Sequence, residues 1–402
     1  MSAPTETFLP PAPPGPITWI RQNLFNNWYN SLITILTLLL IIWAISTVIN
    51  WFLYIADWRP VKEFFLLFMV GQYPQDLVWR VGISLAIICL LFGISWGIGG
   101  QLIQSFAITI GTLLGLAALI PVQIDDLTLP VRAFLIGCVA LLYLGFIWGR
   151  KKPMRGLYVL IAWLLAIGLI IFGLLPGFSN SQVLPAVPST LWGGLLVTLI
   201  LAVGGIVISF PIGILLALGR RSSLPVVKGF CTAVIELIRG VPLVTILFMF
   251  SLILQVFLPV GSRFDRLIRA LIAITIFSAA YMAENIRGGL QAVPSGQIEA
   301  AKAVGMNTFY INLFIVLPQA IRAVIPAIVG QFIALFKDTT LVIILGINEL
   351  LGIGRSVVNA DPEFIQLQLE VYLFIAAIFW IFSYAMSYSS RKLEEALGVG
   401  ER

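Results

Sequence analysis

Long apolar runs follow one another along almost the whole chain, and they constrain its fold more than any other feature. A helix needs about 20 mostly apolar residues to cross the hydrocarbon of a bilayer, and several stretches here reach that length. Such a helix satisfies its own backbone hydrogen bonds, whereas the strand of a membrane barrel alternates polar and apolar residues. Charged residues make up 10% of the chain, against about 25% in soluble domains. We therefore predict an all-α integral membrane protein.

The apolar runs predict about ten membrane-spanning helices. The expected spans are residues 32–55, 81–99, 105–121, 131–149, 156–175, 191–218, 234–258, 267–286, 312–336 and 365–388. Between the second and third spans, Gly97, Gly99 and Gly100 indicate either a tight turn or a glycine-rich packing site within one long broken helix.

Basic residues in short loops predict the orientation, because Lys and Arg gather on the cytoplasmic side of a membrane. The basic clusters are Arg150, Lys151, Lys152 and Arg155; Arg220, Arg221 and Lys228; and Arg391 with Lys392. An even number of spans places these clusters, both chain termini and residues 299–305 on one side, which we expect to be cytoplasm. Arg263, Arg266 and Arg269 on the other side oppose this assignment.

Composition divides the chain into three parts. Residues 1–30 are rich in proline and are expected to form a cytoplasmic tail. Proline, serine and asparagine interrupt the apolar pattern at residues 176–190, so we separate an N-terminal set of spans, residues 31–180, from a second set, residues 187–402. The second set carries more charged residues in or beside its spans, and charged residues within a membrane suggest function.

Several function classes are disfavoured by what the sequence lacks. The chain has no histidine, its cysteines (Cys89, Cys138 and Cys231) are scattered in apolar runs, and no basic stripe is interleaved with aromatic residues. These absences argue against imidazole catalysis, a metal site and nucleic-acid binding. No GxxxxGK[ST] loop occurs, so the usual route to ATP hydrolysis is also missing.

One polar stretch, IEAAKAVGMNTFYINLFIVLPQ at residues 298–319, interrupts the apolar pattern. Pro294 and Ser295 are suited to begin a helix, and Gly305 is placed to end it. Small side chains such as those of Ala300 and Ala301 allow another protein to approach the helix closely. The alternative is a solvated connector that happens to be rich in alanine.

This stretch matches the EAA signature of permease subunits of bacterial ABC importers. The matching residues are Glu299, Ala300, Ala301, Gly305, Leu317 and Pro318. The segments at 236–243 (ELIRGVPL), 279–301 (AAYMAENIRGGLQAVPSGQIEAA) and 336–342 (FKDTTLV) resemble the polar amino acid branch of these permeases. With its extended N-terminal half, the chain resembles the larger, M-type permease of such importers.

The resemblance implies a fold, a function and partners. Five C-terminal helices would form a type I importer core in a bacterial inner membrane, with residues 299–305 as a coupling helix seated in a cytoplasmic ATPase dimer. That ATPase would bind ATP and Mg²⁺, so no cofactor is expected in this chain. A second permease, expected to be a different polypeptide, and an external amino acid-binding protein would complete the importer, with membrane lipid as its surroundings.

Charged and polar residues in the second half are candidates for a gate or a substrate path. Glu236 and Arg239, and likewise Glu284 and Arg287, are spaced to pair on one helical face, either to orient helices or to contact substrate. Residues 337–340 (Lys337, Asp338, Thr339 and Thr340) suit a zwitterion where a helix breaks. They equally suit an outer loop with a helix cap from Asp338.

Two other classes of protein remain as alternatives to an importer subunit. A self-sufficient secondary carrier driven by an ion gradient would use the same charges, but residues 1–180 contain no counterpart of the EAA region, whereas many carriers have two matching halves. A lipid-modifying membrane enzyme would need catalytic groups that the sequence does not offer.

Overall fold

The structure is a computed structural model of the chain, and it describes residues 15–99, 101–119, 124, 126–151, 156–257 and 264–398. Every regular element among these residues is a helix, and the sole β-type pairing among them is a single bridge between Gly194 and Glu349. The prediction of an all-α protein is confirmed. Residues 1–14 of the expected tail, together with Gly100, Lys152, Arg155 and Arg263, lie outside the described residues.

The chain falls into two compact units, divided after Asp57. The first unit contains α1 (Pro16–Asn23), which forms within the expected tail, and α2 (Trp28–Asn50), which a π-helical turn at Trp51–Ile55 continues. No residue of α2 is buried within the chain. Its leucine and isoleucine side chains are therefore available to lipid or to another protein.

The second unit begins with a group of helices that precede the core. They are α3 (Arg59–Glu63), α4 (Phe65–Val70), α5 (Trp79–Gly99), α6 (Gln101–Leu119), α7 (Leu129–Lys151) and α8 (Gly156–Leu169), which a π-helical turn at Ile170–Leu174 continues.

Glycines bring the backbones of α5 and α7 into direct contact. A Cβ atom added at Gly93 would lie 2.0 Å from the carbonyl oxygen of Leu142, and one added at Gly97 would lie 2.5 Å from that of Phe146. Small residues four apart allow this close approach, as in membrane helix pairs generally. Because the contacting residue numbers rise together along both helices, α5 and α7 run parallel, and α6 must return the chain across the thickness between them.

The glycines at the end of the second expected span therefore have two different roles. Gly97 belongs to the packing site against α7, whereas Gly99 is the last residue of α5 before α6 begins at Gln101. The two runs are separate helices rather than one long broken helix.

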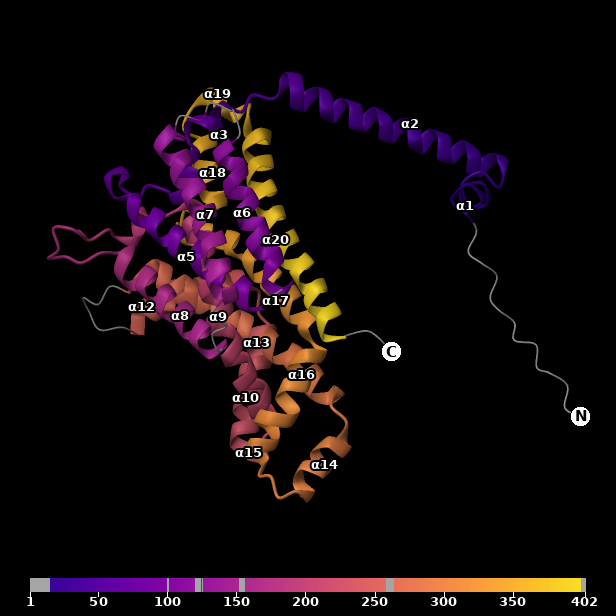
Figure 1. The fold of residues 1–402 in the computed structure, drawn as a ribbon, viewed down its shortest axis with the longest axis vertical. Helices are drawn as coiled ribbons and strands as arrows, with labels where there is room; N and C mark the ends of the chain where they lie inside the picture. Colours follow the sequence, from indigo (N-terminus) through magenta and orange to yellow (C-terminus); the bar gives the residue numbers. More distant parts are fainter. Residues whose placement is uncertain are drawn as a thin grey trace, which may run out of the picture. The chain divides into compact units, whose positions relative to one another are not determined.

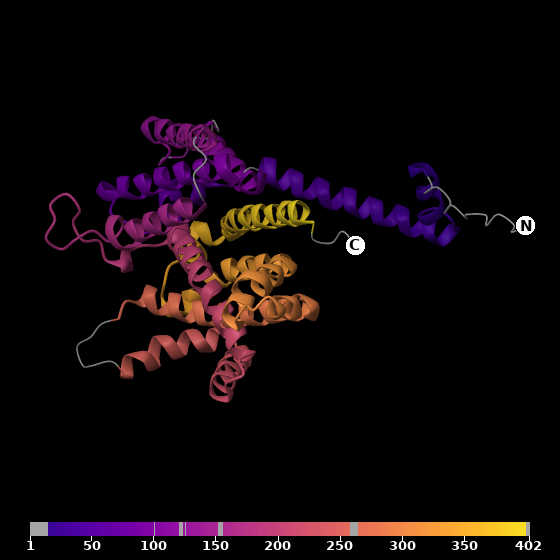
Figure 2. The same ribbon diagram turned by 60° about the horizontal axis from the view of Figure 1, so that its bottom comes forward.

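The second half of this unit holds the remaining helices. They are α9 (Gly194–Arg220), α10 (Pro225–Arg239), α11 (Leu243–Phe248), α12 (Leu254–Phe257), α13 (Arg266–Ala292), α14 (Ser295–Ala303), α15 (Thr308–Tyr310), α16 (Leu317–Ala323), α17 (Ile325–Asp338), α18 (Leu350–Val358), α19 (Pro362–Ile365) and α20 (Gln368–Leu397). Within the unit, α14 and α15 lie at one end, and α18, α19 and α3 lie at the opposite end (Figure 1). Helix α20, yellow in Figure 2, contacts α6 on one side and α17 on the other.

Eight helical segments in the described part of the chain are long and apolar enough to cross a membrane, and a bent pair makes a ninth. The bent pair is Pro225–Arg239 with Leu243–Ile253, at an angle of 107°, and it replaces the straight span expected at 234–258. Helix α6 is apolar but shorter, and the expected span at 312–336 is divided between α16 and α17. The eight long segments correspond to eight of the ten expected spans, the bent pair stands at the seventh, and the shorter α6 stands at the third.

The segment at residues 176–190 is held against the first half of the unit. The Tyr73 hydroxyl donates to the carbonyl oxygen of Leu175 at 2.8 Å, and the buried Arg80 guanidinium donates to that of Pro185 at 2.9 Å. The Gly193 amide then donates to the carbonyl of Val70. The helices before and after this segment therefore pack as one body.

Candidate functional site

Helix α14 stands at one end of the second unit (Figure 1), and in the chain it follows α13 and precedes α15. It begins at Ser295 with Pro294 in the N-cap position, as the residue pattern predicted. Ala301 is buried and packs with the partly buried Ile298, whereas Glu299 and Ala300 are exposed. The helix therefore has one face fixed to this chain and one face open.

A tight turn closes α14 at Gly305. The Gly305 amide donates to the carbonyl of Lys302 at 2.9 Å, and the Met306 amide donates to that of Ala301 at 3.1 Å. These two bonds are the pair that defines a Schellman motif, which requires a left-handed residue after the helix. Gly305 has φ +83°, and a Cβ atom added to it would meet nothing of this chain within 4 Å. Glycine is thus required there by backbone angle and not by space within this chain.

The chain returns to the apolar region through an irregular helix. The Asn307 side chain accepts from the Tyr310 amide and caps the return, and residues Ile311–Val316 form a π-helix. Leu317 and Pro318 then begin α16. Proline is tolerated in a first helical turn because its missing N–H has no partner to lose there, so the Leu-Pro pair marks where regular helix resumes.

The six motif residues therefore occupy three distinct places. Glu299 and Ala300 lie on the open face of α14, Ala301 lies on its buried face, and Gly305 forms the closing turn. Leu317 and Pro318 lie at the start of the next helix. A short helix that is closed by hydrogen bonds and joined directly to α13 and toward α16 can transmit a push or a pull to both.

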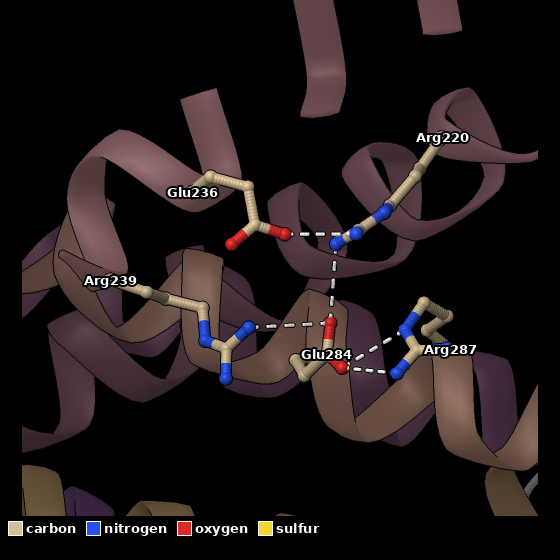
Figure 3. A network of polar contacts seen from close by, with 5 residues as sticks. All are labelled: Arg220, Glu236, Arg239, Glu284 and Arg287. Atoms are coloured by element: carbon tan, nitrogen blue, oxygen red, sulfur yellow. Dashed lines mark hydrogen bonds and ion pairs between the residues drawn. The ribbon is translucent and has the colours of Figure 1, made fainter. Parts of the chain in front are cut away.

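A charged hub joins the ends of α9, α10 and α13. Figure 3 shows Glu284 between three guanidinium groups, those of Arg220, Arg239 and Arg287. Glu284 Oε2 lies 3.3 Å from Arg220 Nη1 and 3.5 Å from Arg239 Nη1, and Glu284 Oε1 accepts from Arg287 Nε at 2.9 Å. Arg220 Nη2 also lies 2.8 Å from Glu236 Oε1. One carboxylate thus ties three helices together.

The hub follows the sequence prediction in one pair and departs from it in the other. Arg287 pairs with Glu284 within α13, as predicted. The expected pair of Glu236 with Arg239 does not form among the described residues, because each side chain finds a partner on a neighbouring helix. Arg220 makes this change of partners possible, because it pairs with both Glu236 and Glu284. Its position at the end of an apolar span had suggested topology alone, and no local spacing connects it to Glu284.

The hub stands directly before the break between α10 and α11. Arg239 is the last residue of α10, and its guanidinium lies 5.5 Å from the ring centroid of Tyr281 on α13. Gly240 and Pro242 follow, and proline cannot continue a helix because it lacks the amide donor. The 107° bend is therefore placed by sequence, and Arg239 holds one side of it to α13.

Residues 337–340 lie inside a span and not in an outer loop, so that interpretation was wrong. Helix α17 passes at Thr339 into a 3₁₀-helix, Thr339–Leu345, within one apolar segment. The Thr339 and Thr340 hydroxyls donate to the carbonyls of Phe336 and Lys337, and the Asp338 side chain makes no cap bond. No described hydrogen bond or ion pair joins these four residues to the hub. Their contact with a substrate stays a prediction.

Glu349 is a buried carboxylate beside the spans of the second half, and the residue pattern assigned it no role. Its side chain is 0% exposed and caps α18 by accepting from the amides of Leu351 and Gly352, each at 2.9 Å. Burial raises the pKa of Glu349 to about 7, although the two amides and the positive charge of Arg355 act in the opposite direction. The buried cap fixes the start of α18.

In the described part of the chain, no group of three or more His, Cys, Asp or Glu side chains gathers in a way that could hold a metal ion. What the described residues do offer is an exposed helix face on α14 and a network of paired charges around Glu284.

Comparison with known proteins gives one family match over part of the chain and two relatives that match almost its whole length. The sequence family of binding-protein-dependent transport system inner membrane components matches residues 209–398. An inner membrane amino-acid ABC transporter permease protein, YhdY of Escherichia coli (strain K12), is 36% identical over 96% of this chain and 94% of its own. The glutamate/glutamine/aspartate/asparagine transport system permease protein BztC of Rhodobacter capsulatus is 36% identical over 98% of this chain and 97% of its own.

Among solved structures, the crystal structure of an amino acid ABC transporter with histidines is 31% identical in sequence. It covers 50% of this chain and 92% of its own, with a TM-score of 0.45.

Proposed function

This chain belongs to the binding-protein-dependent transport system inner membrane components, the permeases of ABC transporters, and from that premise we propose that it imports polar L-amino acids. It is a transport subunit with many helical spans. The two relatives that match almost its whole length carry amino-acid transport in their names, and one names glutamate, glutamine, aspartate and asparagine. Small polar amino acids are therefore the proposed substrates, delivered by an external binding protein.

The observation that carries the mechanism is the open face of α14. Glu299 and Ala300 are exposed on a helix whose other face is packed and whose end is closed at Gly305. In this proposal residues 299–305 seat in an ATPase dimer that binds ATP and Mg²⁺. Closure of the dimer moves α14 as a rigid piece, and α13 and α16 move with it.

Residues 187–402 form the permease core in this proposal, and residues 31–180 add further spans. Both termini face the cytoplasm, on the side of α14. A second permease, a different polypeptide, provides the second docking helix that an ATPase dimer needs. The uncovered side chains of α2 give such a partner, or lipid, a surface to contact.

The hub around Glu284 acts as the inner gate. It joins α9, α10 and α13 close to the loop that carries α14, so movement of α13 changes the distances within the hub. Coulomb attraction between partly buried charges falls with distance and with water entry. Opening the hub thus releases α10, and its bend with α11, from α13.

The substrate path runs past the transition from α17 to the 3₁₀-helix. Lys337 is exposed and Asp338 is half-buried there, which offers opposite charges to the carboxylate and ammonium groups of an amino acid. A loss of transport in Asp338→Asn, with the binding protein still docking normally, is the expected outcome.

The first experiment is a mild-detergent pull-down from the native host, with mass spectrometry of the proteins that come with the chain. We expect an ATPase and a second permease to co-purify with the wild-type chain. Glu299→Arg should lose the ATPase and keep the permease. Glu63→Arg is the matched control, because Glu63 is an exposed carboxylate on α3, at the opposite end of the unit (Figure 1).

Equal recovery of the ATPase with Glu299→Arg and with wild type would remove α14 as the docking element. If the chain purified alone and moved amino acids into liposomes without ATP, it would act as a secondary carrier, and the importer proposal would be wrong.

A further inference from the structure

A basic cavity of about 450 Å³ lies beside the hub, between the end of α9, the first half of α10 and the end of α13. It is lined by Arg220, Arg221, Lys228, Thr232, Arg287 and Gln291. None of these side chains is a carboxylate, and all of them carry hydrogen-bond donors. The cavity is therefore suited to a ligand that only accepts hydrogen bonds and carries negative charge.

Two of the four cations are left without a carboxylate partner in the described part of the chain. Arg220 and Arg287 share Glu284 and Glu236 within the hub. Arg221 donates to a backbone carbonyl, that of Leu290, at 3.0 Å, and Lys228 has no ion pair among the described residues. An anion with several oxygens could accept from the Arg221 guanidinium, the Lys228 ammonium and the Thr232 hydroxyl together. A phosphate group has that shape and charge.

Helix α10 adds an apolar side to the same place. Leu224, Val226, Phe230 and Leu237 are between 62% and 83% exposed within this chain. Val226, Phe230 and Leu237 share one face of α10, whereas Lys228 and Thr232 share another. A helix with one basic and one apolar side, next to membrane spans, belongs at the boundary between headgroups and acyl chains.

We propose that this cavity binds the phosphate of an anionic phospholipid, with the acyl chains along the apolar face of α10. Free phosphate would satisfy the cationic side of the site and leave the apolar side uncovered, so the lipid is the source that fits both. Basic pockets between membrane helices are suited to anionic headgroups. The site adjoins the hub, and the assignment of its ligand does not depend on whether the hub is a gate.

The test measures lipid retained by the purified full-length chain from discs of phosphatidylcholine that contain some phosphatidylglycerol, using native mass spectrometry. Phosphatidylglycerol should be retained in preference to phosphatidylcholine. Each Lys or Arg near the membrane surface attracts anionic lipid, and removing one such cation weakens the binding of that lipid about fivefold. We therefore expect about fivefold lower affinity in Lys228→Gln, about 25-fold in the double variant with Arg221→Gln, and no change in Lys151→Gln, an exposed lysine at the end of α7.

Two further arms separate the sources of phosphate and guard against misfolding. Soluble sn-glycerol 3-phosphate should fail to displace the lipid; displacement at a similar concentration would make this a free-phosphate site and overturn the lipid assignment. Raising the salt concentration should weaken phosphatidylglycerol retention by the unmutated chain, because salt screens exposed charges. Equal retention of both lipids, or an unchanged preference in Lys228→Gln, would also overturn the proposal.

Discussion

Replacing Gly305 by alanine should uncouple ATP hydrolysis from transport through backbone strain alone. Gly305 has φ +83°, and a Cβ atom placed there would meet nothing of this chain within 4 Å. The left-handed conformation costs an ordinary L-residue about 1–2 kcal/mol. The penalty falls on the turn that the Gly305 and Met306 amides close, so the closed turn becomes about 5–30-fold less populated relative to open ones.

The chain supplies a matched control within the same helix. Gly296 lies in α14, also has nothing within 4 Å of a Cβ position, and has no positive φ. Alanine there should favour the helix by about 1 kcal/mol and leave coupling intact. Asparagine at position 305 should retain more coupling than alanine, because asparagine adopts the left-handed region more readily.

The assay is reconstitution of the permease with its ATPase and binding protein in proteoliposomes, with ATP hydrolysis and amino acid uptake measured together. We expect Gly305→Ala to lower the affinity for the ATPase about 5–30-fold and to lower uptake per ATP. Gly296→Ala should match wild type in both. The reasoning would be refuted if Gly305→Ala behaved as wild type while folded normally, or if the two alanine variants were equally impaired.

Three further predictions concern the hub, the glycine contact and the buried cap. Glu284→Gln removes the carboxylate shared by three arginines and should raise ATP hydrolysis in the absence of binding protein. Glu363→Gln, in an exposed pair, should not, since exposed pairs contribute little to stability. Equal hydrolysis rates in Glu284→Gln and wild type would exclude the gate. Gly145→Val places a Cβ 2.5 Å from the Leu90 carbonyl oxygen and should lower the unfolding temperature far more than Gly137→Val, whose Cβ position is open. A similar fall in unfolding temperature in both variants would contradict the close packing of α5 against α7. For Glu349, a folded-state pKa of about 7 against an ordinary value of 4.5 means that the folded state binds the proton more tightly. Its contribution is full below pH 4.5 and is lost as pH rises through about 7, by about 3 kcal/mol. Thermal unfolding across that pH range should show this loss of stability in wild type and a weaker dependence of stability on pH in Glu349→Gln. The same pH dependence in both proteins would contradict the raised pKa of Glu349.

Sequence predicted the local elements of this protein well because their causes are local. Apolar run length is enough to predict a membrane helix, and α14 follows from Pro294, the alanines and Gly305. Gly305 was expected to end this helix, and the structure shows there the left-handed angle that a tight turn after a helix needs. The break after Arg239 was missed, because a straight span was expected at 234–258, although Gly240 and Pro242 are local signals that could have located it.

The partners of the charged side chains were decided only by tertiary structure. Spacing along a helix shows which residues can meet within it, and it found the pair of Glu284 with Arg287. It could not show that Arg220 reaches Glu236 from another helix, because that depends on how α9, α10 and α13 pack.

Helix packing also decided two other features that the sequence did not predict. They are the parallel contact of α5 and α7 and the place of Lys337 inside a span. Residue order fixes which helices form and roughly where each ends. Their relative positions depend on contacts between residues distant in sequence, such as Gly93 with Leu142, and those contacts exist only once the helices have packed.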